Sequence, residues 1–361
     1  MEWWQYFLLI LVPALISLLM SPVAMRAAKR WNLYDHPGPR KVHLKKKPYL
    51  GGLVIFLSFT LTSLFLLPVS AGLLVLLAGG AFFFCLGMLD DFYDLSPRLK
   101  LFVEIAGATL LVWLGMQTGL LLENPFGGIG TGSALVWFSI PFSVFWIVGV
   151  ANAVNLIDGL DALASGVVII ACGVMIIAAL ISQAIFLSPL LLILLAALLG
   201  YIRFNLYPSK MIMGDSGSLF LGYAIAIISL SSFAVPDRSI FLSIIPPAMA
   251  LFVPLFDAAS AVVRRGRSGK RIFSADQNHI HHYLLDQGYA HPRAVRILWG
   301  LSLGFGGLSI ILSELIFRQI YLALALLALV LGWTVFSSFG RDFFTHDNGG
   351  EVKKAEDGDS Q

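Results

Sequence analysis

Long apolar runs separated by short polar stretches fill most of this chain. The runs recur at lengths of about 20 residues, which is what a helix needs to cross the hydrocarbon core of a bilayer. They lack the strict alternation of apolar and polar residues that marks the strands of a transmembrane barrel. We therefore expect an all-α, polytopic integral membrane protein with about 11 transmembrane helices. The expected spans are residues 3–20, 51–68, 71–89, 101–117, 134–151, 163–182, 186–203, 217–234, 240–262, 294–313 and 317–337.

Composition supports this fold class. Of the 361 residues, 58% are hydrophobic and 12% are charged, whereas soluble domains carry about a quarter charged residues. The first stretch, MEWWQYFLLI, is acidic and lacks a basic region and a cleavage site, so we expect a retained span instead of a signal peptide. The two cysteines, Cys85 and Cys172, lie in separate apolar runs without metal-ligand spacing. We interpret both as small buried hydrophobic residues.

The distribution of lysine and arginine predicts the orientation. If the N-terminus is outside, all but two of the 24 lysines and arginines lie on the inner side, and only Arg238 and Arg318 lie outside. The positive-inside rule therefore favours an external N-terminus and a cytoplasmic C-terminus. We expect residues 1–340 to form a single transmembrane domain, followed by a disordered cytoplasmic tail at 341–361. Lys45, Lys46 and Lys47 are interpreted as part of this orientation signal.

Two of four polar clusters on the expected inner side are rich in carboxylates. GMLDDFYDLSPRLK holds the adjacent Asp90 and Asp91, and Lys100 opens the next span. Adjacent carboxylates repel each other unless a cation or a proton is shared, although a solvated loop at a helix end is an alternative. AVNLIDGLDALASG holds Asn155, Asp158 and Asp161. On a helix the two aspartates at i, i+3 share a face, and the alternative is a helix N-cap.

The other two clusters add a lone aspartate and a group of cations. In MIMGDSGSLFLG, Asp215 precedes a span, and this favours either an N-cap or an anion or metal site at the positive helix end. The stretch RRGRSGKRIFSADQNHIHHYL combines five basic residues, Arg271 among them, with His279, His281 and His282. The basic residues alone fit a topology anchor or an anionic-lipid patch. The three histidines indicate a metal or anion site.

Taken together, the clusters indicate phosphoryl chemistry on a lipid. Carboxylate and amide oxygens favour Mg²⁺, with Mn²⁺ as a substitute, and Mg²⁺ commonly binds through few carboxylates plus substrate phosphates. Arginine and histidine donors suit a pyrophosphate. Carboxylates, a hard metal and cations at a bilayer surface are the parts that phosphoryl transfer uses.

The four clusters, in this order, resemble the polyprenyl-phosphate N-acetylhexosamine-1-phosphate transferases. The resemblance covers residues 20–315 and depends on DDFYDLSPRLK, NAVNLIDGLDALASG, MGDSGS and HIHH. It implies a Mg²⁺-dependent enzyme of the bacterial inner (cytoplasmic) membrane with its active site facing the cytoplasm. The implied partners are undecaprenyl phosphate as lipid acceptor, a UDP-N-acetylhexosamine donor and the bilayer. A homodimer is also expected, and nucleic acid is not expected to bind.

The resemblance also implies residue roles. Asp215 resembles the main Mg²⁺ ligand and Asn155 its partner, while Asp90 and Asp91 resemble a pair that deprotonates or positions the lipid phosphate. Lys100 resembles a cation that contacts the phosphates. The catalytic candidates are Asp90, Asp91, Asp158, Asp161 and His281. The candidates for substrate binding are Lys100, Asn155, Arg271, His279 and His282.

The branch of the family and the reaction mechanism leave alternatives open. The motif HIHH resembles the WecA/TagO-like branch, which favours UDP-N-acetylglucosamine, whereas the MraY-like branch more typically has three consecutive histidines and uses a muramoyl-pentapeptide donor. We favour direct attack by the lipid phosphate over a covalent aspartate intermediate. A secondary transporter is the alternative class, and Glu104 is the one acid positioned for it.

Overall fold

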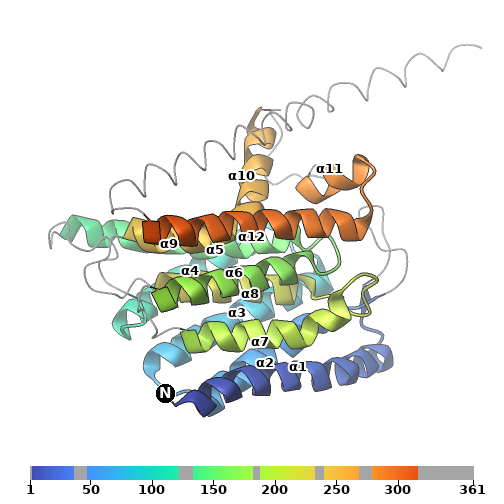
Figure 1. Ribbon diagram of the computed structural model, residues 1–361, viewed down its shortest axis with the longest axis horizontal. Helices are drawn as coiled ribbons and strands as arrows, with labels where there is room; N and C mark the ends of the chain where they lie inside the picture. Colours follow the sequence, from blue (N-terminus) through green and yellow to red (C-terminus); the bar gives the residue numbers. More distant parts are fainter. Residues whose placement is uncertain are drawn as a thin grey trace, which may run out of the picture.

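The computed structural model describes residues 2–35, 47–121, 133–181, 188–231, 240–267 and 279–315. These residues form a helical bundle (Figure 1). A two-residue antiparallel pair, β1 (Tyr34–Asp35) and β2 (Lys47–Pro48), lies beside it. The helices are α1 (Trp3–Trp31), α2 (Gly51–Leu66), α3 (Ala71–Tyr93), α4 (Pro97–Gln117), α5 (Ser133–Ile157), α6 (Leu163–Ile181), α7 (Ser188–Asn205), α8 (Gly214–Ser231), α9 (Ile240–Ala250), α10 (Phe252–Arg267), α11 (Ile280–Asp286) and α12 (His291–Leu315).

The expectation of an all-α, multi-pass membrane protein is confirmed. Within the described residues, seven helices are long and apolar enough to cross a bilayer, and α2 and α7 are shorter apolar helices. The bundle also exposes large apolar side chains such as Phe65, Phe102 and Phe145, as expected where lipid is the solvent. The last expected span, 317–337, and the expected tail lie outside the described residues.

Helix α8 is the centre of the bundle. Every residue from Ser216 to Ser231 is buried, and α8 packs against α2, α3 and α5. Helix α2 packs tightly against the N-terminal end of α8, because a Cβ atom on Gly52 of α2 would lie 2.4 Å from the backbone nitrogen of Gly217. The first turn of α8 is therefore enclosed by neighbouring backbones.

The expectation of one continuous span over residues 240–262 is wrong. The chain turns at Leu251, between α9 and α10, and α10 stands steeply across the other helices in Figure 1. Pro254 explains the position of the break, because its ring lacks an N–H and would collide with the carbonyl of the residue four positions earlier, Ala250.

The expectation that both cysteines are buried is half right. Cys172 is buried, but Cys85 is exposed. Cys85 lies on the side of α3 that also exposes Leu74 and Leu89. In a membrane protein an apolar run can face lipid as well as core, so apolarity alone does not predict burial within the protein.

Candidate functional site

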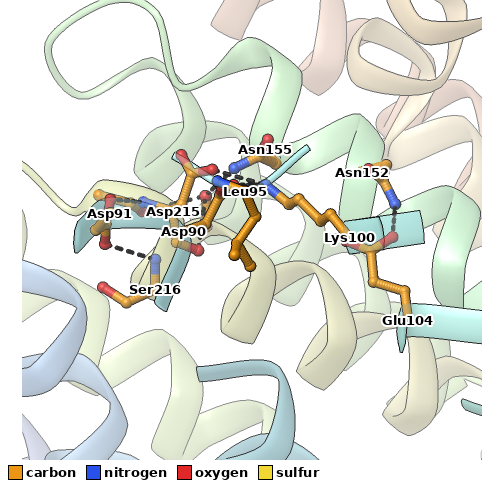
Figure 2. A network of polar contacts seen from close by, with 11 residues as sticks. Asp90, Asp91, Leu95, Lys100, Glu104, Asn152, Asn155, Asp215 and Ser216 are labelled. Atoms are coloured by element: carbon orange, nitrogen blue, oxygen red, sulfur yellow. Dashed lines mark hydrogen bonds and ion pairs between the residues drawn. The ribbon is translucent and has the colours of Figure 1, made fainter. Parts of the chain in front are cut away.

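Three carboxylates and one lysine meet where α3 ends and where α4 and α8 begin (Figure 2). The Nζ atom of Lys100 lies 2.6 Å from an oxygen of Asp90 and 2.7 Å from an oxygen of Asp215. The ammonium group therefore relieves the repulsion between carboxylates that are 125 residues apart in sequence. This contact joins two of the clusters that were found separately in the sequence.

The turn between α3 and α4 positions Asp90 and Lys100. The second oxygen of Asp90 accepts a hydrogen bond of 2.8 Å from the backbone N–H of Leu95. Ser96 then caps α4, and Pro97 occupies its first turn, which is favourable because proline lacks the N–H that would have no partner there. Lys100 consequently lies one turn into α4 and faces back toward the end of α3.

Asp91 points in a different direction from Asp90. Its two oxygens accept hydrogen bonds from the backbone N–H groups of Asp215 and Ser216, at 2.9 and 3.0 Å (Figure 2). The sequence interpretation treated Asp90 and Asp91 as one pair acting on one phosphate. The structure instead gives the two carboxylates separate partners.

Asn155 connects α5 to the start of α8. Its Nδ2 donates a hydrogen bond of 2.8 Å to the hydroxyl of Ser218. One turn earlier on α5, Asn152 donates to the buried carboxylate of Glu104 on α4. Glu104, the acid that was considered as a transport residue, is therefore engaged by a neighbouring helix, one turn further along α4 than Lys100 (Figure 2).

Asp158 and Asp161 do not lie on a helix, contrary to the sequence interpretation. Helix α5 ends at Ile157 and α6 begins at Leu163, and Ala162 takes a left-handed conformation with φ of 63°. The N-cap alternative is also not observed for Asp161, because its oxygens accept hydrogen bonds from Lys47 and Ser209. Gly159 in this stretch allows the turn to lie directly against α11.

Lys47, Asp161 and Ser209 form a second polar cluster. The Nζ of Lys47 lies 2.8 Å from Oδ1 of Asp161, and the backbone N–H of Ser209 donates to Oδ2 at 3.0 Å. Burial alone would raise the pKa of Asp161, but the hydrogen bonds from Lys47 and Ser209 outweigh it and lower the pKa below its usual value. The interpretation of Lys47 as an orientation signal alone missed this ion pair.

The carboxyl group of Asp158 interacts electrostatically with carboxylates of both polar clusters. Burial raises its pKa well above the ordinary value, and the negative charges of Asp215, Asp91 and Asp161 raise it further. Of the two aspartates in this turn, one is held as a carboxylate by cations and hydrogen bonds. The other, Asp158, has its pKa raised by burial and by the neighbouring negative charges.

The histidines lie around the start of α11. The Nδ1 atom of His279 lies 2.9 Å from Asp257 of α10, whose other oxygen accepts from the N–H of Ile280. His281 stacks on His279, with ring centroids 5.7 Å apart, and its ring is tilted against that of His282, with centroids 4.3 Å apart. Asp257 was not identified from the sequence, although a lone acid inside an apolar run is a recognised signal of a polar function.

His281 connects this cluster to the α5–α6 turn. A Cβ atom on Gly159 would lie 2.4 Å from its Nε2 atom, so the ring lies directly against the turn. Its Nδ1 atom is buried and has no hydrogen-bond partner among the described residues. Burial and the neighbouring His282 lower the pKa of His281 to about 3. The ring is therefore neutral near pH 7, and any contact that it made with a ligand would be a neutral hydrogen bond and not an ion pair.

Burial, and to a smaller extent the charge of His279, also lowers the pKa of His282. Arg271, the remaining predicted binding residue, lies outside the described residues. The structure thus places the ten described members of the predicted set in or next to two polar clusters and a histidine group, all at one end of the bundle. The three clusters recruit Lys47, Ser209 and Asp257, which the sequence interpretation left out.

The residues predicted to bind a metal have suitable donors for Mg²⁺. Among the described residues no group of three or more His, Cys, Asp or Glu side chains could hold a metal ion by itself. Asp215 offers a carboxylate that is 39% exposed, and Asn155 offers an amide carbonyl. One carboxylate with further oxygens fits Mg²⁺, because this ion usually keeps several waters and takes the rest of its ligands from substrate phosphates.

Comparison with known proteins gives a consistent set of similarities. A family model described as glycosyl transferase family 4 matches residues 73–233. The chain is 34% identical to a probable undecaprenyl-phosphate N-acetylglucosaminyl 1-phosphate transferase of Bacillus subtilis, over 84% of each chain. It is 32% identical to a decaprenyl-phosphate N-acetylglucosaminephosphotransferase of Mycobacterium tuberculosis, over 83% of this chain and 81% of the relative. It is also 33% identical to a phospho-N-acetylmuramoyl-pentapeptide-transferase of Halalkalibacterium halodurans, over 85% and 97%.

Proposed function

The chain belongs to glycosyl transferase family 4, and on that basis we propose that it transfers N-acetylglucosamine 1-phosphate from UDP-N-acetylglucosamine to undecaprenyl phosphate. The products are undecaprenyl-diphospho-N-acetylglucosamine and UMP. This is the first membrane step in building a cell-envelope polysaccharide. The observation that carries the proposal is the Lys100 ammonium held between Asp90 and Asp215 at the end of an apolar bundle.

The surroundings of that cluster suit a lipid phosphate. Close to Asp90 and Lys100 in sequence, the large apolar side chains of Leu89, Phe92 and Phe102 are exposed. An acceptor with a long hydrocarbon tail can lie along such a surface while its phosphate reaches the polar end of the bundle. A water-soluble acceptor would gain nothing from this arrangement.

The donor is proposed from the relatives and from the second cluster. The Bacillus and Mycobacterium relatives are both named for N-acetylglucosamine, and HIHH departs from the three consecutive histidines more typical of the muramoyl branch. Lys47, Asp161 and Asp158 provide polar groups beyond the Lys100 cluster, where a nucleotide can be held while its diphosphate lies near Lys100. The muramoyl-pentapeptide nucleotide is the donor that the test below must exclude.

The proposed mechanism is a single displacement. An oxygen of the lipid phosphate attacks the β-phosphorus of the donor, the bond to the α-phosphate breaks, and UMP leaves. A phosphate monoester is already largely dianionic near neutral pH, so it needs positioning and charge neutralisation more than a strong base. Lys100 supplies a positive charge, and its contacts with Asp90 and Asp215 hold that charge in place. Mg²⁺ bound by Asp215 and Asn155 would supply further positive charge to the diphosphate.

We also propose that the site faces the cytoplasm of the bacterial inner membrane, where the nucleotide sugar is made. The distribution of lysines and arginines supports this orientation. The secondary-transporter alternative gains no support, because Glu104 is engaged by Asn152 and the aspartates of the predicted site lie at one end of the bundle.

The test is UMP release by purified protein with undecaprenyl phosphate, Mg²⁺ and UDP-N-acetylglucosamine. UDP-N-acetylgalactosamine and the muramoyl-pentapeptide nucleotide are assayed in parallel. We expect release that requires the lipid, and we expect D215N to lose at least about 100-fold in rate because it removes the charge opposite Lys100. D94N is the matched control, since Asp94 is an exposed acid at the end of α3. No release with any donor, from folded protein, would refute the proposed function.

A further inference from the structure

The adjacent residues Asp90 and Asp91 are engaged by different parts of the protein. Asp90 shares Lys100 with Asp215 and accepts from the N–H of Leu95. Asp91 makes neither contact, and its two oxygens accept the N–H groups of Asp215 and Ser216. Figure 2 shows the two side chains directed to separate partners.

The partners of Asp91 are backbone groups that the helix itself cannot satisfy. The first N–H groups of an α-helix have no intrahelical acceptor, and they carry the positive end of the helix dipole. Asp215 and Ser216 are in the first turn of α8, which begins at Gly214. A carboxylate supplied by α3 therefore caps α8 from outside, in the way that an N-cap residue does from within the same chain segment.

Two glycines allow this carboxylate to come close enough. A Cβ atom on Gly87, one turn before Asp91 on α3, would lie 2.3 Å from the carbonyl oxygen of Asp215. Gly214 has a φ of +76°, and a Cβ there would lie 2.8 Å from an oxygen of Asp91. A larger residue at either position would push α3 and α8 apart. The close contact between the helices is thus built around the hydrogen bonds of Asp91.

We propose that Asp91 is a positioning residue: it caps α8 and thereby places the Asp215 carboxylate for the metal and for Lys100. This rests on the proposed function, in which Asp215 is the main Mg²⁺ ligand. Both oxygens of Asp91 face the N-terminus of α8, so in this arrangement its carboxylate holds that helix and not the lipid phosphate.

The cap is tested directly by hydrogen–deuterium exchange of the Asp215 and Ser216 amides, without lipid, nucleotide or metal. In the wild type these amides should be protected, although first-turn amides of a helix ordinarily lack an acceptor. D91N should raise their exchange rate roughly tenfold, since one of the charge-assisted bonds is lost. D90N and D94N should leave it unchanged. Rapid exchange in the wild type would overturn the proposal even if D91N could not be purified in folded form.

The positioning role is tested by Mn²⁺ binding, followed by electron paramagnetic resonance in the same preparations. We expect D91N to bind Mn²⁺ roughly tenfold more weakly than the wild type and D94N to bind it equally well. If D91N exchanges faster but binds Mn²⁺ as tightly as the wild type, the cap has no part in placing Asp215 and the proposal fails. Because no substrate is present, this result is independent of whether the protein releases UMP.

Discussion

At the scale of single residues, Asp161 shows how an ion pair can hold the polar end of the bundle together. Its side chain is 9% exposed and that of Lys47 is 14% exposed, so the two charges are largely removed from water. Such pairs are costly to break from one side, because the remaining charge stays buried without a partner. The hydroxyl and backbone N–H of Ser209 add two further bonds to the same carboxylate.

Replacing Asp161 by asparagine should therefore destabilise the protein in a pH-dependent way. The pKa of Asp161 is lowered in the folded state, so its stabilising contribution is fully present above the unfolded pKa of about 4 and is lost as the pH falls through the folded pKa. We expect D161N to reduce the free energy of unfolding by about 1–3 kcal/mol near pH 7. The difference from the wild type should shrink below about pH 4.

Thermal melting of both proteins in the same detergent, from pH 7 to pH 3, measures this difference. The comparison between variants is necessary because Asp158, whose pKa is raised, changes stability with pH in the opposite sense. A D161N protein that melts with the wild type at pH 7 would show that the ion pair contributes nothing to stability.

The residue types at the site could be predicted from the sequence, but their partners could not. Asp90, Lys100 and Asp215 stand out because charged groups are rare in this chain and cluster at the ends of apolar runs. Nothing in the sequence, however, indicates that Lys47 faces Asp161 across 114 residues. Basic residues at the inner side of a membrane span have a general explanation in topology, and that explanation concealed the specific role of Lys47.

At the scale of elements, contacts between helix ends and turns decide the shape of the site. The chain leaves the helix after Ile157, and the α5–α6 turn that follows meets α11 at Gly159 and His281. The sequence predicted a helix there because the i, i+3 spacing of the aspartates fits one. Ala162 takes a left-handed conformation, which a continuous helix does not allow. The sequence gives no sign of this conformation, since alanine ordinarily favours helix.

The close contact between Gly159 and the His281 ring predicts that G159A disrupts the site more than the fold. The added methyl group would meet the His281 ring at 2.4 Å, and Gly159 does not need a left-handed backbone, so the effect is a collision and not strain in the turn. We expect UMP release to fall roughly 10- to 100-fold. The stability should fall by only about 1–3 kcal/mol.

G149A is the matched control, because Gly149 lies within α5 and a Cβ atom there would meet nothing within 4 Å. It should retain full activity, since alanine favours the helix. Activity assays and melting curves of the two variants give the comparison. Wild-type activity in G159A would show that His281 can move away from the turn without consequence.

At the scale of the whole molecule, all the described polar clusters lie at one end of an apolar bundle. This follows from the physics of the bilayer, because charged groups are tolerated where helices leave the hydrocarbon core and are costly within it. The fold class could be predicted for the same reason, since span length and apolarity are direct consequences of the membrane. The break between α9 and α10 could not be read from length alone, because a proline near the middle of an apolar run can also be accommodated as a kink.

The orientation of the bundle is a prediction that single cysteines can test. Val69 lies just before the start of α3, a candidate membrane span, and Tyr93 lies at its end, and the two are 61% and 74% exposed. In a background with Cys85 and Cys172 replaced by alanine, V69C should react with a membrane-impermeant maleimide in intact cells. Y93C should react only after the cells are permeabilised, because its end of α3 lies beside the start of α4, where Arg98 and Lys100 are among the basic residues that the positive-inside rule places in the cytoplasm. The reverse pattern would put the Lys100 cluster outside, away from cytoplasmic nucleotide sugars, and would contradict the proposed function together with the orientation.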